Sequence, residues 1–141
     1  MYVLDTNICI YAMKGTYPCL NKKLMSIDLD DICISSITVS ELEYGAEKSN
    51  WKARSREIMR MFLSNYMIVS FTEKDAIASG RVRANLAAKG TPIGLYDVMI
   101  AGQAIARDWT VVTHNTKEFV RVPGLRIEDW TEPTTVINLN T

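Results

Sequence analysis

Short apolar runs recur along the chain, and longer segments with helical spacing separate them. Residues 2–4, 32–34, 67–69 and 109–113 are short runs rich in β-branched, aromatic or other apolar side chains, which is typical of strands. We expect the first two of these strands to be buried. Residues 125–127 form a weaker run that we expect to be an edge strand. The pattern therefore predicts four strands, or five with the edge strand.

The intervening segments carry helix signals. Thr38 and Glu41 have the spacing of a capping box, so a helix should begin at Thr38 and end near Gly45. Gly90 follows another long helical stretch in the position of a C-terminal glycine. Gly80 lies inside that stretch, where it either weakens the helix or permits a close contact. The expected helices span residues 8–13, 19–27, 38–45, 49–64, 72–89 and 96–105, with a short one within 114–119.

Helices that alternate with short apolar strands indicate an α/β fold with a parallel sheet. We expect three α/β/α layers around a central, mostly parallel sheet of four to five strands. Crossover connections between its parallel strands should be right-handed. A chain of 141 residues, 48% of them hydrophobic, fits one domain of common size.

Charge and cysteine content narrow the class of protein only slightly. Sixteen basic and sixteen acidic residues balance, so no global charge indicates nucleic acid, although a local basic face remains possible. We expect neither a membrane helix nor a signal peptide, because no apolar stretch is long enough and Asp5 interrupts the N-terminus. Three cysteines without CxxC spacing favour free thiols and a cytoplasmic location.

Three acids share one setting in the predicted fold. Asp5 follows the first strand, Glu41 lies early in the helix after the second, and Asp97 lies early in the helix before the fourth. Each has a structural explanation as a helix cap or as an acid favoured by the helix dipole. In a doubly wound sheet, however, all three would meet at the edge where ligands bind.

Carboxylates packed together repel one another, and a hard divalent cation removes that repulsion. Such an ion can ionise a water molecule and stabilise a phosphodiester during in-line attack. Asn115 and Glu118 follow the fourth strand, where they either supply a further oxygen ligand or cap the short helix. A carboxylate site of this kind needs no histidine base, so we expect His114 to be a loop residue within reach of substrate.

Several segments, in order and at matching spacing, make the sequence resemble the PIN-domain ribonuclease toxins of the VapC type. They are LDTN at residues 4–7, SSITVSELEYG at 35–45, GTPIGLYD at 90–97, VTHNTKEF at 112–119, VPGL at 122–125 and EDW at 128–130. The resemblance implies a PIN-like nuclease domain over residues 1–130 and leaves residues 131–141 as a polar tail.

The resemblance also implies an activity and partners. It implies a Mg²⁺- or Mn²⁺-dependent endoribonuclease that cleaves transfer RNA, inhibits translation, forms homodimers and is silenced by a small VapB-type antitoxin. Asp5 and Asp97 match the principal metal ligands of the family, and Glu41 matches its third acid. Many PIN domains carry a fourth acid where this chain has Asn115, and Glu118 is the candidate replacement.

The remaining expectations concern supporting residues and alternatives. Thr6, Asn7 and Thr113 would position the loop or a bound water, and three cations would contact the RNA backbone: Arg81, Lys89 and Lys117. Unpaired bases would stack on exposed aromatic side chains. One alternative is a non-catalytic RNA- or protein-binding module. A receiver-like phosphoacceptor domain is the other, but Asp5 lacks the adjacent acid expected there.

Overall fold

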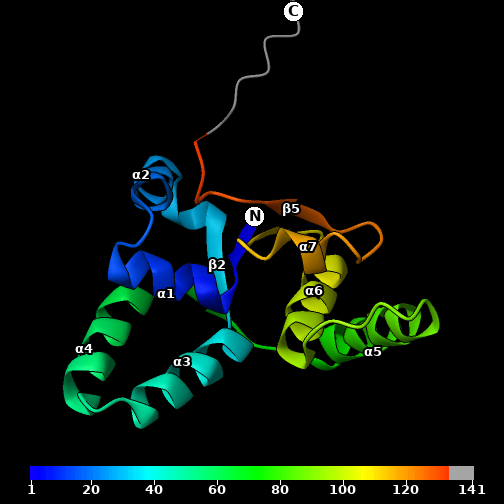
Figure 1. Cartoon of the computed structure of the whole chain (residues 1–141), viewed down its shortest axis with the longest axis horizontal. Coiled ribbons are helices and arrows are strands. Elements are labelled where there is room, and N and C mark those ends of the chain that lie inside the picture. The colour runs from blue at the N-terminus through cyan, green and yellow to red at the C-terminus, as the bar shows by residue number, and fades with distance from the viewer. Residues whose placement is uncertain (134–141) are drawn as a thin grey trace, which may run out of the picture.

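Five parallel strands form the centre of the computed structural model, which describes residues 1–133 (Figure 1). Their order in the sheet is β3-β2-β1-β4-β5, and every pairing is parallel. The predicted α/β class, the parallel sheet and the edge strand are confirmed. The strands are β1 (Tyr2–Leu4), β2 (Ile32–Ser35), β3 (Met67–Val69), β4 (Thr110–Val112) and β5 (Arg126–Glu128).

Helices cover both faces of the sheet, which gives the three expected layers. In Figure 1, α1 to α4 lie on one side of the strands and α5 and α6 on the other. The helices are α1 (Thr6–Lys14), α2 (Pro18–Ser26), α3 (Ser36–Lys48), α4 (Lys52–Leu63), α5 (Glu73–Ala88), α6 (Leu95–Arg107) and α7 (Thr116–Phe119), with a 3-10 turn at Leu29–Asp31.

The strand side chains alternate between two apolar cores, as the period of a strand requires. Leu4 and Val112 pack with α1 to α4, whereas Val3 and Val111 pack with α6 and α7. The chain passes from β1 to β2 on one side and later returns to β4 on the other side of β1. The strand order therefore reverses between β1 and β4, and ligands of such sheets bind beyond the strand ends at that point.

The start of α3 corrects one prediction. Ser35, not Thr38, is the N-cap, and its hydroxyl accepts a hydrogen bond from the backbone N–H of Ile37. The predicted capping box of Thr38 and Glu41 is therefore wrong, because the helix begins two residues earlier than expected. Thr38 is buried within α3. Glu41 lies in the second turn of α3 and has no capping role there.

A capping box at the start of α5, formed by Thr72 and Asp75, also fixes α6 in position. Asp75 receives hydrogen bonds from the backbone N–H of Thr72 and from the Gln103 amide, and it pairs with Arg107 at 3.0 Å. The paired guanidinium and these hydrogen bonds keep the pKa of the fully buried Asp75 below its usual value, against the effect of burial. This network fixes α6, the helix that carries Asp97, against α5.

Two glycines in these helices have opposite surroundings. A Cβ atom added at Gly80 would meet nothing within 4 Å, so the close contact considered for Gly80 is absent. A Cβ atom at Gly102 would lie 2.3 Å from Ser79 Oγ and 2.5 Å from Ser79 Cα. The close approach of α5 and α6 therefore depends on Gly102. Gly90, with a φ of +68°, ends α5 as predicted.

The exposed surface includes several large apolar side chains on α4 and β3. Trp51, Met61 and Met67 are exposed, whereas Met59 is buried and Phe62 packs against the core. Within residues 1–133, no helix combines the length and the apolar character that crossing a bilayer requires. Most of the polar tail, residues 134–141, lies outside the described residues.

Candidate active site

A hollow of about 180 Å³ lies beyond the carboxyl end of β1. It contains all three predicted acids, because the ends of β1, α3 and α6 meet there. Its lining consists of Asp5, Thr6, Asn7, Glu41, Gly94, Leu95, Tyr96 and Asp97. We call it the acid hollow.

Asp5 is both a helix cap and a member of the acid hollow. Its carboxylate accepts a hydrogen bond from the backbone N–H of Ile8 at 2.8 Å, and only 3% of the residue is exposed. Burial raises the pKa of Asp5 to about 6, although the Thr113 side chain and the Ile8 N–H act in the opposite direction. Glu41 raises it further, so Asp5 faces another carboxylate.

Asp97 faces the same group of acids from the first turn of α6. Burial raises the pKa of Asp97 to about 6, and the charges of Asp5, Glu118 and Glu41 act in the same direction. A cluster of like charges is thus concentrated around a partly dehydrated carboxyl group. Perturbed carboxyl groups of this kind are typical of functional sites.

Glu41 and Glu118 are each held by a short polar contact. Thr6 Oγ1 donates a hydrogen bond to Glu41 Oε1 at 2.6 Å and lies 3.2 Å from Thr38 Oγ1. The Asn115 amide donates to Glu118 Oε2 at 2.7 Å. Asn115 therefore orients an acid whose charge acts on Asp97, although Asn115 carries none itself.

The other predicted supporting residues are close to this cluster. Asn7 is exposed and lines the acid hollow. Thr113 is fully buried, and its side chain accepts a hydrogen bond from the Asn115 N–H at 2.9 Å. Its hydrogen bond with Asp5 lowers the pKa of that carboxyl group. His114 points elsewhere: its Nδ1 lies 3.0 Å from Asp129 Oδ2 and 2.9 Å from Thr131 Oγ1.

The predicted RNA-binding cations lie outside the lining of the acid hollow. Arg81 lines a different hollow, with Ile77 and Ile105 between α5 and α6. Lys89 caps the C-terminus of α5, and Lys117 is exposed on α7 beside Glu118. Of the three, only Lys117 is next in sequence to Glu118, whose charge raises the pKa of Asp97.

The donor atoms of the acid hollow fit a hard divalent cation. They are carboxylate, hydroxyl and amide oxygens, which suit Mg²⁺ and Mn²⁺ rather than softer metals. Within residues 1–133, no three histidine, cysteine, aspartate or glutamate side chains are grouped so that they could hold a metal ion together. An open arrangement is compatible with Mg²⁺, which keeps several waters and needs only one or two carboxylates.

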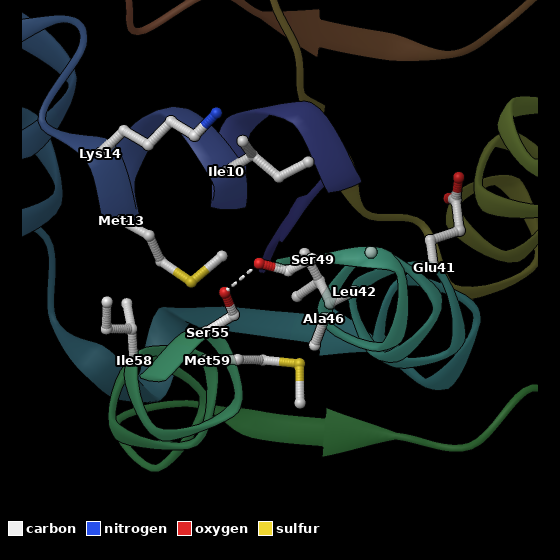
Figure 2. A pocket seen from close by; sticks show the side chains of 11 residues that line it. Ile10, Met13, Lys14, Glu41, Leu42, Ala46, Ser49, Ser55, Ile58 and Met59 are labelled. Carbon is white, nitrogen blue, oxygen red and sulfur yellow. Dashed lines mark hydrogen bonds between the residues drawn. The ribbon is translucent and has the colours of Figure 1, made fainter. Parts of the chain in front are cut away.

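A second hollow, of about 340 Å³, adjoins the acid hollow and was not predicted. Figure 2 shows it between α1, α3 and α4, with Glu41 of α3 at one end and Lys14 at the end of α1. Its walls are mostly apolar, with Ile10, Met13 and Ile58 among them, and the hydroxyls of Ser55 and Ser49 are hydrogen-bonded within it. We call it the apolar groove; Glu41 lines both hollows.

Sequence analysis also missed Gly94, Leu95 and Tyr96 as part of the lining of the acid hollow. Their position directly before Asp97 could have indicated this, because residues next to an acid in the first turn of a helix lie close to it in space. The apolar groove had no comparable signal, since its walls come from three helices.

Comparison with known proteins identifies the family and the fold. Residues 2–125 match the PIN domain family. A protein of Salmonella typhimurium named "tRNA(fMet)-specific endonuclease VapC" is 45% identical over 92% of this chain and 97% of its own length. "Ribonuclease VapC2" of Rickettsia felis is 41% identical over 92% of this chain and 98% of its own length.

Solved structures of VapBC proteins have the same fold as this chain. A DNA-bound VapBC structure from Salmonella typhimurium superimposes with a TM-score of 0.87 at 45% identity, covering 92% of this chain and 97% of that one. VapBC-1 of nontypeable Haemophilus influenzae gives a TM-score of 0.84 at 32% identity, with 93% and 98% covered. The chain belongs to the PIN-domain family and, within it, to the VapC-type ribonucleases. It is accordingly an endoribonuclease with the predicted three-layer fold.

The raised pKa values of Asp5 and Asp97 predict how the stability of the metal-free protein depends on pH. Between the ordinary value of 3.8 and about 6, the folded state binds more protons at these groups than the unfolded state does. Their contribution to stability is therefore fully present below that window and is lost as the pH rises through it. Denaturant titrations at pH 4 and pH 7 should show a smaller loss of unfolding free energy in Asp97→Asn than in wild type. An equal loss in both proteins would contradict the repulsion inferred from the site.

Proposed function

We propose that the chain hydrolyses phosphodiester bonds of transfer RNA with the help of Mg²⁺ or Mn²⁺, as the toxin of a toxin–antitoxin pair. The observation that carries the proposal is that buried Asp5 and half-buried Asp97 line one hollow, where burial and neighbouring carboxylates raise the pKa of both groups. A divalent cation is the simplest ligand that stabilises such a cluster in its charged form.

In this proposal, Asp5 and Asp97 are the principal metal ligands and Glu41 is the third acid. The bound ion would ionise a water molecule and neutralise charge on the phosphate. Thr6 holds Glu41 in place through its 2.6 Å hydrogen bond, and Thr113, the residue after β4, hydrogen-bonds Asp5. Glu118, oriented by Asn115, supplies the fourth carboxylate of the cluster.

Transfer RNA is the substrate suggested by the Salmonella relative, whose name specifies tRNA(fMet). Cleavage of transfer RNA would inhibit translation, and the chain would then act in the cytoplasm. Lys117, beside Glu118, is the best placed of the predicted cations for a phosphate contact near the acids. Arg81 and Lys89 would contact RNA farther from the acid hollow.

The ends of the RNA products test this chemistry. Attack by an activated water needs no 2′-hydroxyl, so the products should lack a 2′,3′-cyclic phosphate. A substrate with a single 2′-deoxynucleotide at the cut site should still be cleaved. Cyclic phosphate ends, or loss of cleavage in the 2′-deoxy substrate, would instead indicate attack by the ribose and contradict the proposal.

We also propose a VapB-type antitoxin as the partner that silences the enzyme, with the chain forming a homodimer. Several of the solved structures to which this chain is similar are VapBC assemblies. The apolar groove adjoins the acid hollow at Glu41, so a partner segment with apolar side chains could fill the groove and block the acids. Amphipathic helices of partner proteins commonly bind by placing their apolar face in a hydrophobic groove.

Replacing Ile58 with Glu tests the groove. Ile58 lines it and is 41% exposed, so the change should leave the fold intact. Inhibition by a VapB-type antitoxin should weaken by about tenfold or more, because the new carboxylate would be left unpaired in an apolar contact. RNA cleavage without antitoxin should stay unchanged. Ile77→Glu, at an exposed isoleucine of the α5–α6 hollow, is the matched control. Full inhibition of Ile58→Glu would rule out this docking site.

A further inference from the structure

Two large apolar side chains lie exposed at the rim of the acid hollow. Leu95 is 56% exposed and Tyr96 is 51% exposed, and both directly precede Asp97 in the first turn of α6. In the described part of the chain, the Tyr96 ring pairs with no other aromatic side chain and belongs to neither apolar core. Packing therefore does not explain an aromatic ring at this position.

The position of Tyr96 relates it directly to the reacting group. Tyr96 and Asp97 are consecutive residues, so their Cα atoms are only about 3.8 Å apart. A nucleobase is joined to its own phosphate through a single ribose. A phosphate held at the acids therefore brings a neighbouring base within reach of the residues that line the same hollow.

The aromatic side chains around His114 are less suitable for this role. The His114 ring lies 5.3 Å from the Tyr17 ring and 6.1 Å from the Tyr11 ring, while its Nδ1 contacts Asp129 and Thr131. Tyr11 and Tyr17 also pack against the core. These rings are held by their neighbours and do not line the acid hollow. Tyr96 lines the acid hollow and has no aromatic partner among the described residues.

We propose that Tyr96 is the platform on which an unpaired nucleobase beside the scissile phosphate stacks, with Leu95 as an apolar flank. The proposal rests on the proposed function, because it needs an RNA phosphate at the acids. Bases of single-stranded RNA loops commonly stack on tyrosine rings, and such stacking tolerates different base identities. Tyr96 thus positions the substrate and would favour loops over duplex RNA.

The test uses the Asp5→Asn protein and short single-stranded RNAs that carry 2-aminopurine at successive positions. Asn is a good N-cap, so this background should retain the fold while the RNA stays uncut. Stacking on Tyr96 should quench the fluorescence of one position. Tyr96→Phe should keep the quenching, whereas Tyr96→Leu and Tyr96→Ala should lose it and weaken RNA binding about tenfold. This order separates ring stacking from hydroxyl bonding and from simple apolar contact.

Tyr44→Ala is the matched control, since Tyr44 is 65% exposed on α3 and lines neither the acid hollow nor the apolar groove. It should bind RNA as the parent does. In the otherwise wild-type protein, Tyr96→Ala should lower kcat/KM mainly through KM, with the Mn²⁺-induced rise in melting temperature unchanged.

The outcomes separate this inference from the proposed function. Unchanged RNA binding and quenching in Tyr96→Ala would overturn the stacking role, even if the wild type cleaves RNA in Mn²⁺. Weakened antitoxin binding with unchanged RNA binding would overturn it as well, and would assign the rim to the protein partner. Absence of metal-dependent cleavage in the wild type would instead refute the proposed function.

Discussion

Asp97→Asn is expected to reduce RNA cleavage at least about 100-fold, the size of effect seen when a group that stabilises transition-state charge is removed. The substitution removes one carboxylate from the acid hollow and, under the proposed mechanism, one principal metal ligand. Asp5→Asn should have a similar effect. Both proteins should fold, because Asn remains an acceptable cap at residue 5 and each change removes like-charge repulsion.

Asp108→Asn is the matched control for this prediction. Asp108 caps the opposite end of α6 with a φ of +57°, a conformation that Asn tolerates well, and its carboxylate pairs with Arg126 at the surface. Initial rates of transfer RNA cleavage and thermal melts of all three variants should be compared with wild type. Cleavage at the wild-type rate by Asp97→Asn would contradict the role assigned to this acid.

Gly102→Ala should lower the free energy of unfolding by about 3 kcal/mol, near the upper end for overpacking a tight contact. The added Cβ atom would lie 2.5 Å from the Cα atom of Ser79, so backbone would have to move. Ser79 cannot easily move away, because its hydroxyl bonds the Asp75 carbonyl in α5 and lies 3.3 Å from the Met99 carbonyl in α6. The change should also displace α6, and RNA cleavage should fall with stability.

Gly80→Ala, one residue from Ser79 on the same helix, should have the opposite effect. A Cβ atom added at Gly80 would meet nothing within 4 Å, and alanine favours a helix interior over glycine by up to about 1 kcal/mol. Urea denaturation of the two variants measures the contrast. Stabilisation by both substitutions would show that α5 and α6 are not as closely packed as described.

The pattern of apolar runs was sufficient to predict the sheet, because each run is short and bounded by polar turns, and the runs of the three central strands, β1, β2 and β4, are mostly buried. The meeting of the acids at one edge of the sheet could also be predicted. Asp5 follows a strand and Asp97 lies at the start of a helix, and such ends meet at the same edge of a parallel sheet. Both the alternation and the strand ends are local features of the sequence.

What could not be predicted depends on contacts between distant segments. Thr38 and Glu41 have the spacing of a capping box, but Ser35 is the N-cap of α3. Glu41 therefore has no capping role and lines the acid hollow. Gly80 and Gly102 look alike in sequence, and only the approach of α5 to α6 distinguishes them. Likewise, the amide of Asn115 occupies the place where an acid was expected and holds Glu118 beside Asp97.

Titration of Mn²⁺ into the chelator-treated protein tests the central claim most directly, with transfer RNA cleavage as the readout for wild type and Asp97→Asn side by side. The account predicts no cleavage by either protein before metal is added, followed by saturable recovery in the wild type and little recovery in Asp97→Asn. Cleavage by the metal-free wild type, or equal recovery in both proteins, would contradict the claim that the acid hollow is a metal-dependent nuclease site.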